Sequence, residues 1–217
     1  MSTLAQIRDR CEQQLADTGN AIWSTFWVDE GIRQALAEYS WQMPRRLITT
    51  VTLSADAWEI DISSISGVLF VQRVWLPYTA SAPEDPPEWR GFEWWKDSNL
   101  LLVTTGEQPA SGDVARIFYG AAQTIQDLDS ASATTIPVPD ESLIVAGAIG
   151  FAVLSRGLDV KEQVTLGRRD SEQLRAWGNE RLLEFRTALA RRAGQEAARS
   201  WGHVAIPALD RWDRSWS

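Results

Sequence analysis

Two groups of closely spaced carboxylates are the residues of this chain that could supply both a general acid and a general base. They are Asp56, Glu59 and Asp61 in one group, and Glu84, Asp85 and Glu88 in the other. Acid–base catalysis requires two such groups at a fixed separation, in surroundings that move their pKa values apart. No further motif accompanies either group, so we interpret both as side chains of solvated loops.

Nucleophilic and metal-dependent chemistry have less support still. His203 is the single histidine and Cys11 the single cysteine, so one chain can form neither a Cys/His zinc site nor a disulfide. No G-x-S-x-G elbow presents a serine to His203, and the sequence contains no phosphate-binding P-loop. Residues 127–129 lack the glycine and the distal glutamate of a helix-loop-helix calcium site. We therefore expect a protein that is not an enzyme and that needs no metal or cofactor.

Aromatic side chains offer a different kind of chemistry, because the chain has 12 tryptophans and gathers several of them in one short segment. Trp89, Phe92, Trp94 and Trp95 could stack on sugar rings, which makes a carbohydrate-binding module of a virion or cell-surface assembly the alternative function. In a strand, however, Phe92 and Trp94 share one face and Trp95 takes the other. We therefore expect at least one aromatic set to pack in a β core or in a subunit interface.

The composition is that of a folded, acidic protein. The 217 residues are 44% hydrophobic and 23% charged, with a formal net charge of -8. These values exclude a disordered chain and argue against a protein built mainly to neutralise phosphates. The polar N-terminus lacks the apolar core of a signal peptide, and the lone cysteine fits a reducing compartment. The longest apolar run, residues 143–154, is shorter than the roughly 18 residues that cross a bilayer, so we expect a buried helix and no membrane partner.

Residues 1–45 have the pattern of a helical pair. An apolar residue recurs every three or four positions at Leu4, Ile7, Cys11 and Leu15. This spacing predicts an amphipathic helix that begins after Thr3 as N-cap and ends near residues 18–20. A second helix is predicted to begin at Asp29 as its cap and to end at Pro44. Its apolar face consists of Ile32, Ala35, Leu36 and Tyr39.

Residues 46–125 change to the two-residue period of β-strands and contain many β-branched side chains. Strand-like runs occur at residues 47–54, 57–62, 67–78, 92–95, 100–106 and 113–122. We predict an antiparallel β-rich insertion of about five strands, with a tight turn at residues 96–99. Residues 79–91 contain three prolines, which cannot donate to a β ladder, so we predict an exposed loop there.

Helical periodicity returns in residues 126–193. We predict one helix at residues 141–154, with Asp140 as its cap and Gly157 near its end. Its GAIG segment favours close packing of helices rather than nucleotide binding, because no strand precedes it. A second, bent helix is predicted at residues 160–193 in spite of two internal glycines. These helices complete the bundle that residues 1–45 begin.

The extended C-terminal tail, residues 194–217, loses this periodicity but keeps large apolar side chains. They are Trp201, Val204, Ile206, Leu209, Trp212 and Trp216. Disordered tails rarely carry so much apolar surface, so we expect the tail to dock either on its own domain or on a neighbouring subunit. Arginines interleave with these tryptophans, a composition typical of protein interfaces, and the acidity of the chain favours a protein partner over a nucleic acid.

The predicted order is helical pair, β-rich insertion, helical pair and tail, which is an α+β fold dominated by a helical bundle. On residues 22–44, 139–159 and 177–192, the chain resembles the head-tail adaptor (connector) proteins of tailed bacteriophages. The first stretch combines an aromatic-containing loop, an acidic cap and a helix that ends at proline. The other two form a compact apolar helix and a long helix. The Trp-rich middle departs from this family's general pattern.

The resemblance implies a structural protein of the virion neck that is assembled in the host cytoplasm. Its copies would form a ring, commonly a dodecamer, beneath the portal protein, and would carry a downstream neck or tail protein. Double-stranded DNA would pass through the channel without specific binding, which an acidic surface favours. The C-terminal segment of such proteins often inserts into the portal. This implies portal-docking roles for Trp201, Ile206, Leu209, Trp212 and Trp216.

Overall fold

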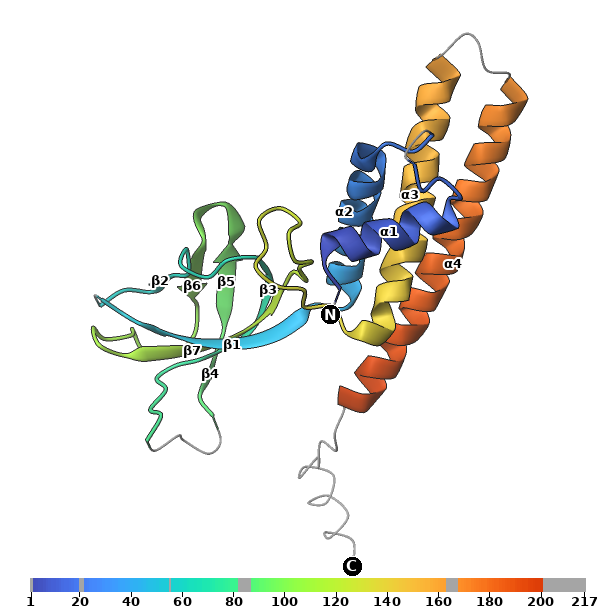
Figure 1. Ribbon diagram of the computed structural model, residues 1–217. Coiled ribbons are helices and arrows are strands. Elements are labelled where there is room, and N and C mark those ends of the chain that lie inside the picture. Colours follow the sequence, from blue (N-terminus) through green and yellow to red (C-terminus); the bar gives the residue numbers. More distant parts are fainter. Residues whose placement is uncertain (1, 20–21, 55, 82–86, 163–167, 201–217) are drawn as a thin grey trace, which may run out of the picture.

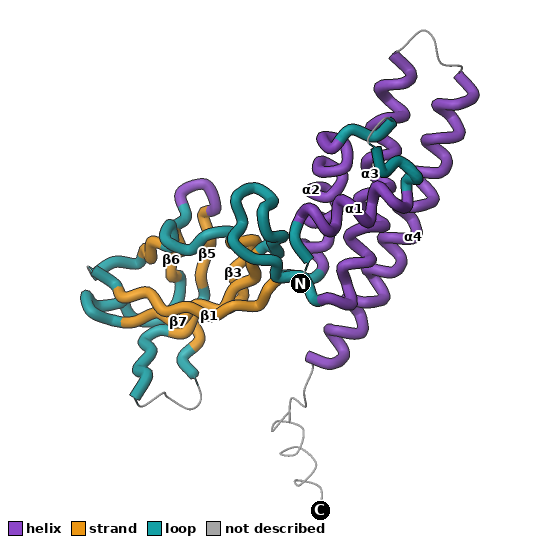
Figure 2. Tube along the Cα trace, viewed as in Figure 1, coloured by secondary structure: helices purple, strands orange, loops and turns teal. Residues whose placement is uncertain are grey.

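The computed structural model describes residues 2–19, 22–54, 56–81, 87–162 and 168–200. Its α-helices gather in one half of the molecule, and a β sandwich projects sideways from them (Figure 1). Helices come from both ends of the chain and strands from its middle, and the two kinds of element occupy separate halves of the molecule (Figure 2). This confirms the predicted α+β fold, in which a helical bundle carries an antiparallel β insertion.

Helix α1 (Leu4–Gln14) begins where the sequence predicts but ends before the predicted residues 18–20, because Ala16 adopts a positive φ of 53°. Thr3 and Gln6 form a capping box, in which the Gln6 amide donates to Thr3 Oγ1 (3.4 Å) and the Thr3 amide donates to Gln6 Oε1 (3.0 Å). The predicted apolar positions Leu4, Ile7 and Cys11 are buried. Burial raises the pKa of the Cys11 thiol to about 12, so this group stays protonated and packs as a small apolar side chain.

Helix α2 (Thr25–Gln42) begins before Asp29, which corrects the prediction that Asp29 caps it. Ser24 occupies the N-cap position instead. Asp29 lies inside the helix, where its two carboxylate oxygens accept hydrogen bonds from the Arg8 guanidinium of α1 (2.8 and 2.7 Å). This bidentate ion pair accounts for the acidic residue at that position. The buried side of the helix includes the predicted residues Ile32, Ala35 and Tyr39.

Helices α3 (Glu141–Glu162) and α4 (Arg168–Ser200) pack along each other as a helical hairpin whose ends differ from the predicted ones (Figure 1). α3 continues through Gly157, and α4 begins after residue 160 and continues beyond residue 193. A glycine costs a helix about 1 kcal/mol relative to alanine. Packing between two long helices stabilises them by more than this, so the glycine does not end α3.

Glycines allow α3 to approach its neighbours closely. A methyl group at Gly31 of α2 would collide with the backbone carbonyl of Ala148 in α3. One at Gly150 of α3 would lie 2.7 Å from a methyl carbon of Leu182 in α4. The GAIG segment therefore serves helix packing, as predicted.

The helical core lies where α2, α3 and α4 meet. Its buried apolar residues include Ile7, Val28, Ile32, Tyr39, Ile144, Ala148, Leu182, Phe185 and Leu189. The window Val138–Arg156 has the length and composition of a membrane-crossing helix, yet 56% of it is buried inside the protein. α3 is accordingly the central helix of this core, as the sequence predicts for residues 143–154.

Asp140 ends the short helix η2 (Val138–Asp140), directly before α3, but its carboxylate does not serve as the predicted helix cap. One oxygen accepts a hydrogen bond from the Tyr39 hydroxyl of α2 (2.8 Å), and the other accepts one from the Arg192 guanidinium of α4 (2.8 Å). Burial and the hydrogen bond to Asp140 raise the pKa of Tyr39, so its hydroxyl remains a donor. Three helical elements are tied together by this single carboxylate.

The β insertion consists of two antiparallel sheets. The four-stranded sheet has the order β1 (Arg45–Thr52), β7 (Val114–Ala121), β3 (Val68–Trp75) and β4 (Trp89–Arg90). The three-stranded sheet has the order β2 (Glu59–Asp61), β6 (Leu100–Val103) and β5 (Phe92–Trp95), with the turn η1 (Lys96–Ser98) between β5 and β6 as predicted. A second apolar core between the sheets contains Leu53, Ile60, Ile62, Val74, Leu76, Leu101, Val103, Ala115 and Ile117.

The described residues contain seven strands, which corrects the prediction of about five. Strand β4 lies in residues 79–91, where the prolines predicted a loop throughout. It pairs with the end of β3, with Val74 opposite Arg90 and Trp75 opposite Trp89. Trp89 and Arg90 follow the last proline of the segment and keep their amide hydrogens, so a short ladder can form there.

A buried glutamine joins the sandwich to the bundle. The Gln123 amide N–H donates to Ser40 Oγ of α2 (3.0 Å), and its side-chain amide donates to the Met43 carbonyl (2.8 Å). Ser40 Oγ in turn donates to the Leu36 carbonyl (2.7 Å). The residues that follow β7 are thereby held against the end of α2, close to where β1 begins.

We expect Asp140→Ala to lower the free energy of unfolding by about 2–3 kcal/mol, because it leaves a buried tyrosine hydroxyl without an acceptor and an arginine without its ion pair. Urea unfolding followed by circular dichroism measures this loss. Glu184→Ala is the matched control, since Glu184 forms only an exposed pair with Arg181 and should change stability by less than about 0.5 kcal/mol. Equal losses in the two variants would contradict the role of Asp140.

Glu141 should contribute a stabilisation that depends on pH. Its buried carboxylate accepts hydrogen bonds from the backbone and hydroxyl of Ser2 (2.8 and 2.7 Å) and pairs with Arg10 (3.1 Å). Burial alone would raise its pKa, but these hydrogen bonds and the Arg10 charge hold the pKa below its ordinary value. A depressed pKa stabilises the fold above the unfolded-state pKa of about 4.3, and this stabilisation is lost as the pH falls through the folded-state pKa.

The difference in unfolding free energy between the wild type and Glu141→Gln should therefore shrink on acidification from about pH 5 to pH 3. Urea titrations at several pH values measure it. A difference that stayed constant over this range would contradict the contribution assigned to the Glu141 carboxylate.

Candidate functional site

The outer face of the four-stranded sheet gathers large aromatic side chains and arginines. We call it the aromatic–arginine face. It consists of Arg46, Ile48, Arg73, Trp75, Tyr78, Trp89, Arg116 and Phe118. The strand register places them together, because Ile48 lies opposite Phe118 and Phe118 lies opposite Arg73. Alternate residues such as Val51 and Ile117 point to the opposite face of the sheet, into the core of the sandwich.

Trp89 is the exposed centre of the aromatic part of this face. Its ring lies edge-on to Phe118, with 5.6 Å between the ring centroids, and 6.0 Å from the ring of Trp75. The Arg73 guanidinium lies over the Trp89 ring, 5.2 Å from its centroid. These contacts hold Trp89 in one orientation although 42% of it is exposed, so it presents a fixed apolar surface.

Next to Trp89 on this face, Arg116 contacts several aromatic side chains. Its guanidinium lies 4.7 Å from the Tyr78 ring centroid and 5.6 Å from that of Phe118, and it donates a hydrogen bond to the Tyr78 hydroxyl (3.0 Å). Trp75 is buried beneath these side chains, and its indole N–H has no hydrogen-bond acceptor among the described residues. The arginine is thus fixed by aromatic faces and a hydroxyl rather than by a carboxylate.

The charge of this face is opposite to that of the chain. Within the described ranges, no carboxylate forms an ion pair with Arg46, Arg73 or Arg116. The whole chain nevertheless has a formal net charge of -8. Ile48 adds an apolar side chain that is 52% exposed. Exposed aromatics held next to arginines are the composition of protein interface hot spots.

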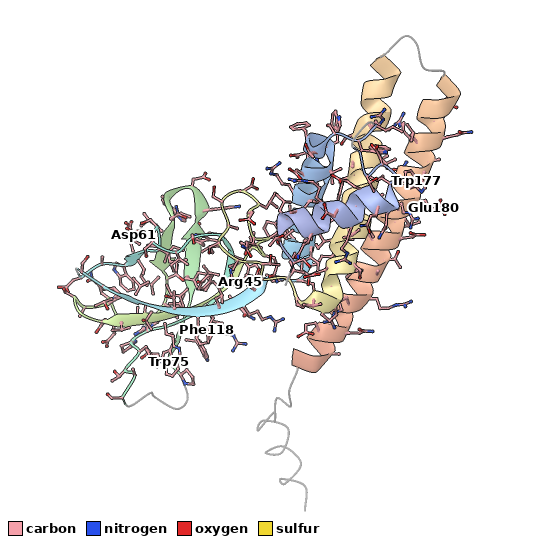
Figure 3. The ribbon with its side chains drawn as sticks, in the orientation of Figure 1. Arg45, Asp61, Trp75, Phe118, Trp177 and Glu180 are labelled. Carbon is pink, nitrogen blue, oxygen red and sulfur yellow. The ribbon has the colours of Figure 1, made fainter. Side chains whose placement is uncertain are left out.

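The outer face of the three-stranded sheet has the opposite charge. We call it the acidic face, and it consists of Glu59, Asp61, Glu93, Trp95, Leu100 and Leu102. Glu59 and Glu93 flank Leu102 from the two neighbouring strands, and Asp61 and Trp95 flank Leu100 in the same way. Asp61 lies on one side of the sandwich, and Trp75 and Phe118 lie on the other (Figure 3). The sandwich therefore has a basic and an acidic side, each with apolar residues between its charges.

The predicted alternation of aromatic side chains in the tryptophan segment is confirmed. Phe92 and Trp94 pack against the core of the sandwich, while Trp95 points outward and is 54% exposed. Trp89 belongs to the other sheet, where it pairs with Trp75. Trp89, Trp94 and Trp95 consequently do not form a single flat platform for a sugar ring.

The carboxylates considered for acid–base chemistry do not form an acid–base pair in the part of the chain that the structure describes. Asp56 accepts a hydrogen bond from the Ser111 amide, and Glu88 pairs with Arg90 (2.8 Å). Asp61 accepts from the amide of Ser63 (2.8 Å), and hydrogen bonds from Ser63 lower its pKa, which disfavours a proton donor at neutral pH. Glu84 and Asp85 lie outside the described residues.

The remaining predicted residues have structural roles or lie beyond the described ranges. Asp129, in the segment compared with a calcium loop, accepts from the Arg33 guanidinium (2.9 Å). Among described residues, no group of three or more His, Cys, Asp or Glu side chains could hold a metal ion. Helix α4 is described up to Ser200. Trp201, His203, Ile206, Leu209, Trp212 and Trp216 lie outside the described residues.

A groove of 390 Å³ opens at the inner side of the four-stranded sheet. It is lined by residues that include Arg45, Thr49, Ser64 and Tyr119. Arg45 lies where the sandwich meets the bundle (Figure 3). The lining contains one cation and no carboxylate, so the groove offers no acid–base pair and we assign the functional surface to the two outer faces.

Sequence reasoning identified Trp89 and Trp95 but missed the arginines that accompany Trp89. Arg46, Arg73 and Arg116 stand on three different strands. Their common face follows only from the pairing of those strands. The alternation of Arg116 with Ile117 and of Arg46 with Leu47 was the local signal that each arginine points away from the core.

No protein-family model matches the sequence, and no curated protein matches it either. Among solved structures, the chain is similar to a chain in the neck of a native GTA particle computed with C12 symmetry. The two have 15% sequence identity and a TM-score of 0.30, over 68% of this chain and 78% of that one. A likeness at this level carries no argument about what the present chain does.

We expect Trp89→Ala to lower the free energy of unfolding by about 1–2 kcal/mol, because the ring gives up its contacts with neighbouring rings but is already 42% exposed. Trp94→Ala should cost about 3 kcal/mol, because it empties part of the sandwich core. Guanidinium titrations measure both values. If Trp89→Ala were as costly as Trp94→Ala, Trp89 would be a core residue and not a surface available to a partner.

Proposed function

We propose that this protein is a structural head-tail adaptor of a tailed-phage-type particle. Copies of the chain form a ring beneath the portal protein, extend the channel for double-stranded DNA and hold a downstream neck or tail protein. The protein belongs to the virion neck and is assembled in the host cytoplasm. It acts by assembly and not by catalysis.

The exposed aromatic–arginine face is the observation that carries this proposal. Ile48 and Trp89 remain 52% and 42% exposed, and the arginines around them have no carboxylate partner in the described ranges. Such a surface is stabilised when a partner covers it. An assembly subunit, whose faces are covered by its neighbours, accounts for it better than a free monomer does.

The order of the elements also supports the proposal. Two helices precede the β insertion and two longer helices follow it, as expected from the resemblance to head-tail adaptors. The small residues of α3 let three helices pack closely around one core. This gives a rigid bundle from which the sandwich projects, as a ring subunit with several partners requires.

The charge of the chain supports passage of DNA without binding. With a net charge of -8, the protein as a whole repels the phosphate backbone. The arginines of the sandwich lie over aromatic rings on one face. Burial of that face in a subunit interface would leave acidic surface for the channel.

The test is the mass of native assemblies formed by the full chain with and without the portal protein of the same particle. Mass photometry and negative-stain electron microscopy should detect a closed ring of this chain on the portal. A chain that stayed monomeric at micromolar concentration and did not bind the portal ring would contradict the adaptor function.

The tail can be tested in the same system, because α4 ends at Ser200 and truncation after this residue leaves every described element in place. We expect the truncated chain to bind the portal at least roughly 100-fold more weakly, since one interface tryptophan contributes about 2 kcal/mol or more, which is about 30-fold, and the tail carries three. The matched control is the full-length chain with Trp201, Trp212 and Trp216 replaced by alanine, which should weaken binding similarly. Unchanged binding of both variants would exclude portal docking by the tail.

A further inference from the structure

The two outer faces of the sandwich are complementary to each other. The aromatic–arginine face carries three arginines from three strands, and the acidic face carries three carboxylates from two strands. Arg46, Arg73, Glu59 and Glu93 are exposed, and none of them forms an ion pair with a described residue. Three arginines on one surface and three carboxylates on another attract the two surfaces and determine how they align.

The apolar residues of the two faces are also suited to each other. On the basic side, Trp89, Phe118 and Ile48 lie among the arginines. On the acidic side, Leu100, Leu102 and Trp95 lie between the carboxylates. Each face thus combines an apolar centre with a charged surround, which is the arrangement of protein interfaces.

From this we propose that the acidic face of one copy of the chain docks on the aromatic–arginine face of the next copy. The proposal rests on the proposed ring of subunits and adds the surfaces by which its members meet. Contact between two aromatic–arginine faces would bring arginines against arginines, and contact between two acidic faces would bring carboxylates together. Both symmetric pairings are therefore disfavoured.

The position of the faces makes this contact heterologous. They lie on opposite sides of the same sandwich (Figure 3), so each copy has one basic side and one acidic side to offer. Repetition of a contact between two different faces adds copies in one direction and produces a ring where the rotation closes. A sandwich wedged between two neighbours would then bury both of its outer faces.

Two charge-reversal variants test the proposal. Arg46→Glu with Arg73→Glu makes both sides of the sandwich acidic, and Glu59→Arg with Glu93→Arg makes both sides basic. All four side chains are exposed and none touches the core of the sandwich, so both variants should keep the circular dichroism spectrum of the wild type. The loss of the Arg73 contact with the Trp89 ring should lower the stability of the first variant by only about 0.5–1 kcal/mol. Arg116 and Asp61 are left unchanged because each makes an internal hydrogen bond.

We expect each variant alone to lose self-association by roughly 100-fold or more, because like charges then meet across every contact. An equimolar mixture should recover assembly, since an acidic side of one variant meets a basic side of the other at each contact. Recovered rings should contain the two variants in alternation, which native mass spectrometry detects as equal numbers of each. This rescue separates a specific contact from a general effect of net charge.

The proposal is wrong if either variant assembles as the wild type does, or if both lose assembly and the mixture stays dissociated. It is also wrong if a peptide of residues 201–217 binds the aromatic–arginine face of the 1–200 fragment and Trp89→Ala abolishes this binding, since the tail would then occupy the face. The proposed function fails separately, when the wild type neither self-associates nor binds the portal ring. If the wild type forms rings and both variants form them equally well, the adaptor function still stands but this interface is wrong.

Discussion

The two-residue alternation of the β-strands is the constraint on which both functional faces depend. Once Ile117 is buried between the sheets, Arg116 and Phe118 on either side of it have to point outward. In the same way, burial of Leu101 turns Leu100 and Leu102 to the other side. A slip of one residue would place charged side chains in the core, at a cost of several kcal/mol each, so the register is strongly specified. One packing requirement therefore produces a basic and an acidic side.

The helical bundle gives the sandwich a rigid base. Its helices approach closely because Gly31 and Gly150 leave room for the neighbouring backbone and side chain. The Asp140 carboxylate then ties α2 to α4 through two hydrogen bonds. Gln123 extends this order to the sandwich by bonding to the end of α2. A subunit that holds two partners in a fixed relative position requires rigid contacts between its bundle and its sandwich.

Segregation of charge reconciles an acidic chain with an arginine-bearing face. The arginines are held by aromatic rings and by the Tyr78 hydroxyl, so they remain available to carboxylates of another chain. Glu59 and Glu93, which form no ion pair with any described residue, stand on the opposite side of the sandwich. Self-complementarity of this kind suits the proposed ring, in which one contact repeats between neighbouring copies. In the proposed ring, this contact would also remove the arginines from the surface that faces DNA.

The sequence by itself determined the α+β class, the capped start of the first helix, the buried faces of the helices and the alternation within the strands, because these follow from local periodicity and capping chemistry. Helix boundaries were misplaced at the end of α1, at Asp29 and at Gly157. At Asp29 an ion pair to Arg8, and at Gly157 packing between α3 and α4, outweighed the local signals. Only the tertiary structure decided that Trp89 pairs with Trp75 and that Arg46, Arg73 and Arg116 share one face. These residues are far apart in the chain, and strand order, which long-range burial selects, brings them together.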